Sequence, residues 1–284
     1  MQTRFVVNII LLVFIIGAAV YLTRTEPEQD TEPVVTLSDV PAADIARIVI
    51  DRKNRETIRF EKSGDTWSML EPYHAPASPQ RIDTILGLLS SASAYQLKAE
   101  ETDPGRLLLQ EPEITLTLNN ETFSFGDVNP LDKKRYVLYR DTVHLVHDNL
   151  YPQLATSPTF FIDTRVLPEK REVKKIQYPL YRLVNENGQW SLESELDVSD
   201  ETVRGLANTW KELRASHVQA YEPLEALYEI RVEFTDGEIV RYEVVSDLPD
   251  LVLARPDIGL QYHVPEYLSD KLFPREEPEP DAAP

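Results

Sequence analysis

The chain reads Asp65-Thr66-Trp67-Ser68-Met69 in its first half and Gly188-Gln189-Trp190-Ser191-Leu192 in its second half. Each stretch follows a β-rich segment that ends near Phe60 or Leu183. A short distance later, each copy has a serine followed by residues typical of a helix N-terminus, Ser78-Pro79 and Ser199-Asp200. The sequence therefore predicts that one unit, a hairpin followed by a helix, occurs twice.

Three further patterns recur in the same order and support a duplication. Apolar residues repeat with a helical period after both serines. Residues 113–118 and 229–234 alternate as half-buried strands do, and Asn119-Asn120 and Asp236-Gly237 then supply hairpin turns. Residues 136–140 and 251–255 form the last pair of strands. The apolar helix positions are Ile82, Ile85, Leu86 and Leu89 in the first copy and Val203, Leu206, Trp210 and Leu213 in the second.

These repeats predict an α+β protein with two similar modules, each an antiparallel sheet packed with a helix. The first module is expected over residues 41–168 and the second over residues 169–273. The boundary falls near the polar stretch that follows Leu167.

The N-terminus carries a long apolar run. Residues Phe5 to Leu22, with Leu11 and Phe14 among them, form an apolar segment bounded by Arg4 and Arg24. As a helix this segment is roughly 27 Å long, close to the thickness of a bilayer core. We expect residues 1–24 to form an uncleaved signal anchor. A buried core helix and a cleaved signal peptide, the latter indicated by the small residues Gly17-Ala18-Ala19, are the alternatives.

The flanking charges predict the location of the chain. Arg4 precedes the apolar run, whereas Arg24 is followed by several acids, which favours a cytoplasmic N-terminus. We therefore expect a single-pass protein of a bacterial inner membrane, with the bulk of the chain in the periplasm. Residues 25–40 are expected to be an acidic, proline-rich linker, and residues 274–284 a disordered acidic tail.

Composition excludes several classes of function. The chain has 48 acidic and 29 basic residues, a net charge of −19, which disfavours nucleic acid as a partner. It has no cysteine, which excludes disulfides, thiolate metal sites and a cysteine nucleophile. Its 9 glycines never cluster as a phosphate-binding loop requires. We therefore predict no cofactor.

No group of residues has the pattern of a catalytic or metal site. His144 and His147 lie three apart on a predicted strand and so point to opposite faces. Asp127 and Asp132 are candidates for a calcium loop, but the glycine and glutamate of an EF-hand loop are missing. We therefore predict no catalytic and no metal-binding residue.

The aromatic and charged motif residues are interpreted as structural. Trp67 and Trp190 are expected to pack a helix on its sheet, and a sugar-stacking platform is the alternative. Asp163 and Arg165 are expected to form an ion pair that closes the first module.

Several of these motifs resemble one family. The stretch from Trp67 to Pro72, the Ser-Pro helix start, Phe125-Gly126, Tyr136-Val137 and the pair Asp163 and Arg165 resemble the bacterial family known as domain of unknown function 4340. The resemblance covers residues 45–167 best and the second half more weakly. It implies an association with ABC-2-type transporter components and gliding-motility auxiliary proteins, and it implies no enzymatic activity.

The sequence thus favours a non-enzymatic, membrane-anchored periplasmic protein that binds or scaffolds a membrane or envelope protein, as an accessory to an ABC-type transporter. Two other classes remain open. One is an envelope glycan or peptide hydrolase that uses paired carboxylates. The other is a solute-binding module with its ligand between the two modules.

Overall fold

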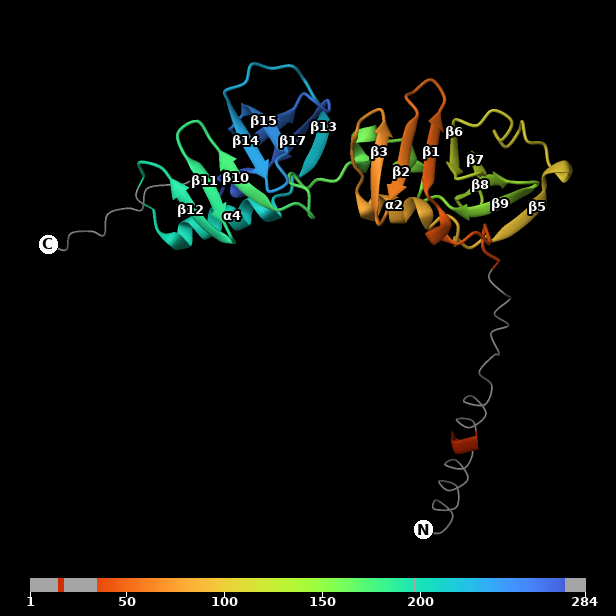
Figure 1. Cartoon of the computed structure of the whole chain (residues 1–284). Coiled ribbons are helices and arrows are strands. Elements are labelled where there is room, and N and C mark those ends of the chain that lie inside the picture. The colour runs from red at the N-terminus through yellow and green to blue at the C-terminus, as the bar shows by residue number, and fades with distance from the viewer. Residues whose placement is uncertain (1–14, 18–34, 197, 274–284) are drawn as a thin grey trace, which may run out of the picture. The chain divides into compact units, whose positions relative to one another are not determined.

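A computed structural model describes residues 15–17, 35–196 and 198–273 of the chain (Figure 1). The chain divides into two units, residues 1–35 and 36–284, and both modules lie in the second. Apart from residues 15–17, the predicted anchor with Phe5, Leu11, Phe14 and Leu22 lies outside the described residues, as does the tail 274–284. Within the described part of the chain, no helix is long and apolar enough to cross a membrane.

The first module is an antiparallel sheet of nine strands with the order β4-β3-β2-β1-β6-β7-β8-β9-β5. Its strands are β1 (Arg47–Arg52), β2 (Ile58–Ser63), β3 (Thr66–Glu71), β4 (Ala75–Pro76), β5 (Tyr95–Lys98), β6 (Ile114–Leu118), β7 (Glu121–Val128), β8 (Lys134–Tyr139) and β9 (Thr142–His147). Its helices are α2 (Pro79–Leu86) and the single turn α3 (Tyr151–Leu154), and 3-10 turns lie at η1 (Ala42–Asp44), η2 (Ala99–Glu101) and η3 (Pro158–Phe161).

The second module is an antiparallel sheet of eight strands with the order β12-β11-β10-β14-β15-β16-β17-β13. Its strands are β10 (Val173–Gln177), β11 (Arg182–Glu186), β12 (Gln189–Glu193), β13 (His217–Ala220), β14 (Tyr228–Phe234), β15 (Ile239–Ser246), β16 (Leu251–Arg255) and β17 (Leu260–Val264). Its helices are α4 (Asp200–Glu212) and the short α5 (Glu266–Ser269).

The two strand orders are the same once β4 is set aside. Strands β1, β2 and β3 correspond to β10, β11 and β12, and β5 to β9 correspond to β13 to β17. Helices α2 and α4 follow the third strand in each module, and α3 and α5 follow the last. The prediction of two similar antiparallel modules is confirmed, and strands make up far more of each module than helix does.

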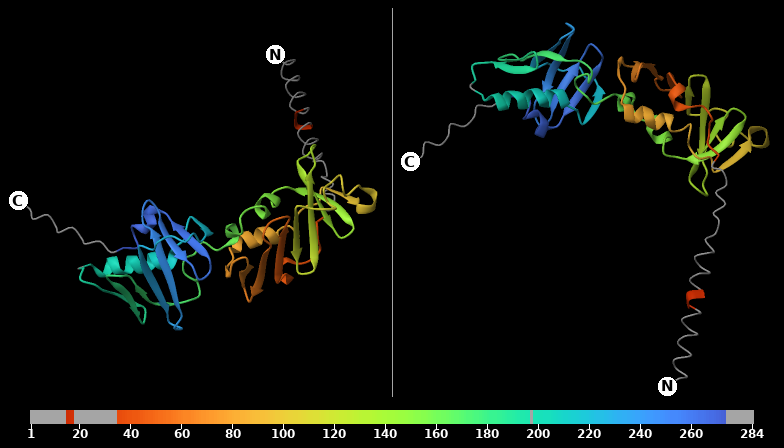
Figure 2. Two further views of the ribbon diagram at one scale, coloured as in Figure 1. Left: turned by 90° about the horizontal axis from the view of Figure 1, so that it is seen from above. Right: turned by 60° about the horizontal axis from the view of Figure 1, so that its bottom comes forward.

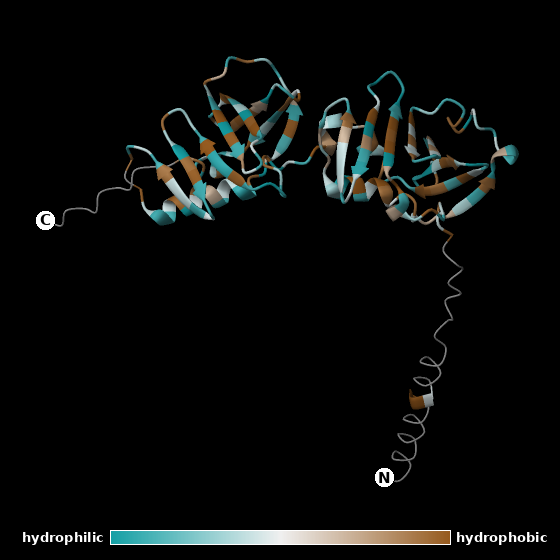
Figure 3. Cartoon of the chain, viewed as in Figure 1, coloured by the Kyte–Doolittle hydropathy of each residue, from teal (hydrophilic) through white to brown (hydrophobic). Residues whose placement is uncertain are grey.

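Each main helix packs on one face of its own sheet, as the views in Figure 2 show. Helix α2 contacts β3, and α4 contacts β12. Ile82 and Ile85 of α2, and Val203, Leu206 and Trp210 of α4, are buried. Apolar and polar residues alternate along many strands (Figure 3). In β6 the alternation buries Ile114, Leu116 and Leu118, and in β14 it buries Ile230, Val232 and Phe234.

Helix α2 is shorter than the sequence predicts. It ends at Leu86, and Gly87 caps it by donating its backbone N–H to the carbonyl oxygen of Asp83. Leu89, expected on the helix, is buried in the turn that follows. Glycine has little preference for a helix, which accounts for the early end. Ser199 caps α4 as predicted by accepting from the backbone N–H of Thr202, whereas the side chain of Ser78 makes no such bond.

The predicted hairpin turns lie where the sequence places them. Asn119 has a φ of 54° between β6 and β7, and Gly237 has a φ of 88° between β14 and β15. Both values lie in the left-handed region that asparagine and glycine tolerate best. The Asn119 side chain also accepts from the backbone N–H groups of Ala46 and Arg47. The first turn is therefore tied to the start of β1.

Both modules begin earlier than predicted. Leu37 is buried, and its backbone N–H donates to the carbonyl oxygen of Ser91, so the first module begins by residue 36 and not at 41. In the same way, the backbone N–H of Val166 donates to the carbonyl oxygen of Leu213. The second module therefore begins before residue 169.

Gly126 lies in β7, where a loop crosses the strand. The backbone N–H of the next residue, Asp127, donates to the carbonyl oxygen of Leu107 at 2.9 Å. A Cβ atom at position 126 would lie 2.3 Å from that carbonyl oxygen and 2.8 Å from the Cδ2 atom of Leu109. Only glycine permits the loop to approach so closely.

We expect Gly126→Ala to lower the free energy of unfolding by about 2 kcal/mol or more, because the clash involves backbone. Gly205→Ala is the matched control, since no atom lies within 4 Å of a Cβ built there in α4. It should raise the free energy of unfolding by about 0.5–1 kcal/mol. Urea unfolding of both variants measures these changes, and equal effects would contradict the packing described for β7.

Candidate functional site

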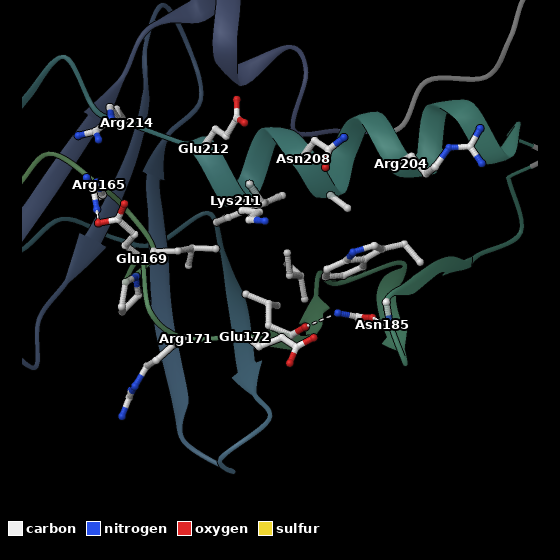
Figure 4. A pocket seen from close by; sticks show the side chains of 18 residues that line it. Arg165, Glu169, Arg171, Glu172, Asn185, Arg204, Asn208, Lys211, Glu212 and Arg214 are labelled. Atoms are coloured by element: carbon white, nitrogen blue, oxygen red, sulfur yellow. Dashed lines mark hydrogen bonds and ion pairs between the residues drawn. The ribbon is translucent and has the colours of Figure 1, made fainter.

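A groove runs along α4 in the second module, between the helix, the β10–β12 part of the sheet and the segment that leads into β10 (Figure 4). Its volume is about 750 Å³. We call it the α4 groove. It is lined by Arg165, Leu167, Pro168, Glu169, Arg171, Glu172, Val173, Ile176, Asn185, Gly188, Trp190, Arg204, Ala207, Asn208, Trp210, Lys211, Glu212 and Arg214.

The bottom of the groove is apolar and fixed. Ile176 and Trp210 are fully buried, and the indole N–H of Trp210 donates to the hydroxyl of Tyr178. That hydroxyl in turn donates to the carbonyl oxygen of Leu272. Burial raises the pKa of Tyr178 well above its ordinary value, so it stays a neutral donor. The apolar bottom of the groove, beneath the polar rim, is therefore a rigid part of the core.

A shorter connection accompanies the groove in the second module. Thr36 bridges Ala92 in the first module, and Arg165 bridges Arg214 in the second. Eleven positions lead from Thr36 to the start of β1 at Arg47, but only eight lead from Arg165 to the start of β10 at Val173.

The two connections also differ in what they bury. The longer first connection contains η1 and places Val40 and the fully buried Ile45 against the core. The second connection has the exposed residues Pro168, Glu169 and Lys170 instead. Val166 and Leu167 at its start are buried, but residues 168–172 bring no buried apolar side chain into the space beside the helix, and the groove opens there.

Cations outnumber acids around the groove. Five arginine or lysine side chains line it, against three glutamates. Three of the cations are paired: Arg165 with Glu169, Arg171 with Glu238, and Arg214 with Asp163 at 3.5 Å. The hydrogen bond from Arg165 lowers the pKa of Glu169, and the hydrogen bond to Glu238 raises the pKa of Arg171. These pairs hold part of the rim in place.

Arg204 and Lys211 differ from the other cations. Neither forms an ion pair with any residue in the described part of the chain, and both are exposed. Figure 4 shows Lys211 directed from α4 over the groove, with Arg204 farther along the same helix. Counting from the N-cap serines, the corresponding positions of the first module are Asp83 on α2 and Ser90 in the turn after it. Helix α2 carries its own cation, Arg81, which packs over the Phe160 ring, but the first module has no cation at the positions of Arg204 and Lys211.

Trp67 and Trp190 occupy equivalent places in their sheets. Trp67 lies opposite Lys62, and Trp190 lies opposite Asn185. Both rings are half-buried and pack against the core, and Trp190 also lines the α4 groove. Pro72 directly follows β3 and lies away from the groove.

Asp163 and Arg165 lie between η3 and β10. Their charged groups are 3.9 Å apart, and Asp163 also pairs with Arg214 beyond α4. The Asp163 carboxylate accepts from the backbone N–H of Arg165 at 3.1 Å. The pair therefore fixes the start of the second module as well as the end of the first.

The histidines include a pair that the sequence did not reveal. His217 and His263 lie opposite each other on β13 and β17, and their rings stack with centroids 4.4 Å apart. His144 takes the same place in the first sheet, since it lies opposite Val137 as His263 lies opposite Val252. His217 and His263 are far apart in sequence and come into contact through the pairing of β13 with β17. No periodic signal marks such a contact.

The histidines have the features of packed side chains. Burial lowers the pKa of His144 and of His263, and nearby His217 lowers the latter further. His147 is exposed on the opposite face of β9 from His144, as predicted. Among residues 35–196 and 198–273, no three side chains of the types that hold a metal ion come together.

The shifted pKa values of the carboxyl groups favour the charged form. In the described part of the chain, each carboxyl group with a shifted pKa is shifted downward, and hydrogen bonds from Lys174 and Lys175 lower the pKa of Glu233 to about 2. A general acid requires the opposite shift. In the loop that the sequence disfavours as a calcium site, Asp127 and Asp132 accept from the backbone N–H groups of Val128 and Lys134.

The chain belongs to a known family. The model described as Domain of unknown function (DUF4340) matches residues 67–235, more than half of the chain. The match runs from Trp67 in β3 to the residue after β14, so the DUF4340 region includes parts of both sheets, all of α4 and Trp190. No curated protein and no solved structure matches the chain.

We expect Asp163→Ala to lower the free energy of unfolding by about 1–2 kcal/mol, because it removes one hydrogen bond and two partly buried ion pairs. Asp163→Asn keeps an acceptor for the Arg165 N–H and should cost less. Glu193→Ala breaks the ion pair with Arg182, in which both side chains are about half exposed, and serves as the control. It should change the free energy by less than about 0.5 kcal/mol. Chemical unfolding tests the order of the three variants, and a cost for Glu193→Ala as large as that of Asp163→Ala would contradict this account.

Proposed function

We propose that this DUF4340 protein is a non-enzymatic binding module of the cell envelope, which holds its partner in the α4 groove. The observation that carries the proposal is the groove itself, with Arg204 and Lys211 unpaired in the described part of the chain. Its volume lies within the range of about 300–1,000 Å³ that is common for binding sites.

The difference between the two copies supports binding over a purely structural role. Unpaired charge on a helix contributes nothing to the core, and the first module has Asp83 and Ser90 at the matching positions. The second copy thus has cations at two positions where the first copy has an acid and a serine, beside the apolar wall of the groove. A charged rim above an apolar wall is suited to recognition.

The charge of the groove also favours binding over hydrolysis. A hydrolase that uses two carboxylates needs one of them protonated at neutral pH. The glutamates that line the groove are all exposed, and Arg165 lowers the pKa of Glu169. These acids are better suited to orienting arginines than to proton transfer.

The location and the partner that we propose for this module rest on the sequence. The apolar run from Phe5 to Leu22, between Arg4 and Arg24, supports an anchor in the bacterial inner membrane with the modules in the periplasm. A module held at the membrane surface meets membrane proteins first. We therefore propose a membrane or envelope protein as partner, and a role as accessory to an ABC-type transporter.

A photo-crosslinking experiment tests this proposal in the membrane. The full chain is expressed with p-benzoylphenylalanine at Asn208, an exposed residue of α4 that lines the groove. We expect irradiation to give a distinct crosslinked product with one envelope protein. The control places the same amino acid at Asp83 of α2, which is also exposed, and should not give that product.

The outcomes separate the parts of the proposal. The same products from both positions, or none from Asn208, would contradict a partner in the α4 groove. Identification of a permease or ATPase subunit by mass spectrometry would support the transporter role. Any other envelope protein would overturn that role and leave the binding function in place.

A further inference from the structure

We infer that the α4 groove and the outer edge of β12 together bind an extended acidic segment of a partner protein, which adds to the second sheet as a further strand. This inference rests on the proposed function and specifies the chemistry of the partner. Three features of the second module carry it: the spacing of the cations, the edge of the sheet and the position of Trp190.

The cations are spread along a line instead of converging on one point. Arg204 and Lys211 are seven residues apart on α4, which corresponds to about 10 Å along the helix axis. Arg214 lies beyond the helix end, and Arg171 lies on the facing segment. A compact anion such as phosphate needs donors that surround it. Cations spaced along a groove match acids spaced along an extended chain.

The edge of the second sheet is open where the first is covered. In the first module, β4 pairs with the outer side of β3 through Ala75 and Pro76, which lie opposite Met69 and Ser68. The corresponding edge of the second sheet ends at β12, and no strand in the described part of the chain pairs with its outer side. A free edge presents unpaired backbone groups and accepts an added strand.

The open edge and the groove meet at one residue. Trp190 is the second residue of β12 and also lines the α4 groove. Glu193, the one acid on β12, is neutralised by Arg182. A strand laid along β12 would therefore contact the indole of Trp190 and bring its acids toward Lys211 and Arg204.

The acids of the chain itself are the main competitors for this site. Residues 26–32 and 276–281 are rich in glutamate and aspartate. A partner segment is favoured because Glu276, Glu277 and Glu279 are interspersed with prolines, and proline has no N–H to donate to a sheet edge. Occupancy by the C-terminal segment is an outcome of the test.

Binding of a defined peptide tests the inference. The probe is a fluorescein-labelled peptide of twelve residues with alternating glutamate and valine, added to the full chain in non-ionic detergent. Fluorescence anisotropy measures its dissociation constant at low and at physiological salt. We expect saturable binding that weakens with salt. A matched peptide with glutamine in place of glutamate should bind at least tenfold more weakly.

Two protein variants separate the groove from the net charge. Arg204→Glu combined with Lys211→Glu should weaken binding at least tenfold. Arg106→Glu combined with Arg241→Glu makes the same change of charge at exposed residues outside the groove and should alter binding less than twofold. Equal losses in the two variants would overturn the groove as the site.

A third peptide tests strand addition. The same acidic sequence with N-methyl groups on alternate residues keeps its charge but cannot pair along a sheet edge. We expect it to bind at least tenfold more weakly than the probe. Equal affinity would overturn strand addition at β12.

Neutralising the tail tests the competitor. Glu276→Gln, Glu277→Gln and Glu279→Gln, combined in one chain, should leave the affinity for the probe unchanged. A large gain would show that the tail fills the groove and would overturn an external partner. A crosslinked partner at Asn208 without any binding of the acidic peptide would overturn this inference while the proposed function stands.

Discussion

In each module, one helix must bury its apolar side against the sheet beside the third strand, and the segment that enters the module must be tied to the residues that follow that helix. Leu37 donates to the Ser91 carbonyl in the first copy, and Val166 donates to the Leu213 carbonyl in the second. These bonds fix where the first strand begins. The eight shared strands then follow in the same order, and the space beside the helix depends on how the entering segment fills it.

The sequence was informative wherever a feature is local. The hairpins at Trp67 and Trp190, the turns at Asn119 and Gly237, and the alternation in β6 and β14 all depend on residues close together in the chain. The pairing of β5 with β9 and of β13 with β17 joins distant segments. A repeated sequence pattern therefore does not predict which strand lies at this edge of each sheet. The α4 groove was missed because it arises from a shorter connection, which leaves no motif.

The second module differs from the first in its exposed helix residues and at the edge of its sheet. Both sheets have apolar residues at the buried positions that the fold requires. The differences between the two modules considered next lie at exposed helix positions and at the sheet edge. Arg204 and Lys211 of α4 match Asp83 of α2 and Ser90 in the turn after α2. At the sheet edge, the strand β4 has no counterpart among the described residues. A chain that is negative overall thus carries a groove with two cations that form no ion pair with a described residue. A local excess of positive charge on an acidic protein favours an acidic partner.

The central claim is that the open space beside α4 is the binding site. A swap of the connections between the two modules tests it most directly. Residues 168–171 are replaced by residues 39–45 of the first module, which restores the longer, apolar connection. A seven-residue Gly-Ser segment at the same place is the control. We expect the swapped protein to keep its thermal midpoint and to lose crosslinking from Asn208. The Gly-Ser control should retain most of that crosslinking. Undiminished crosslinking in a folded swap would contradict the account.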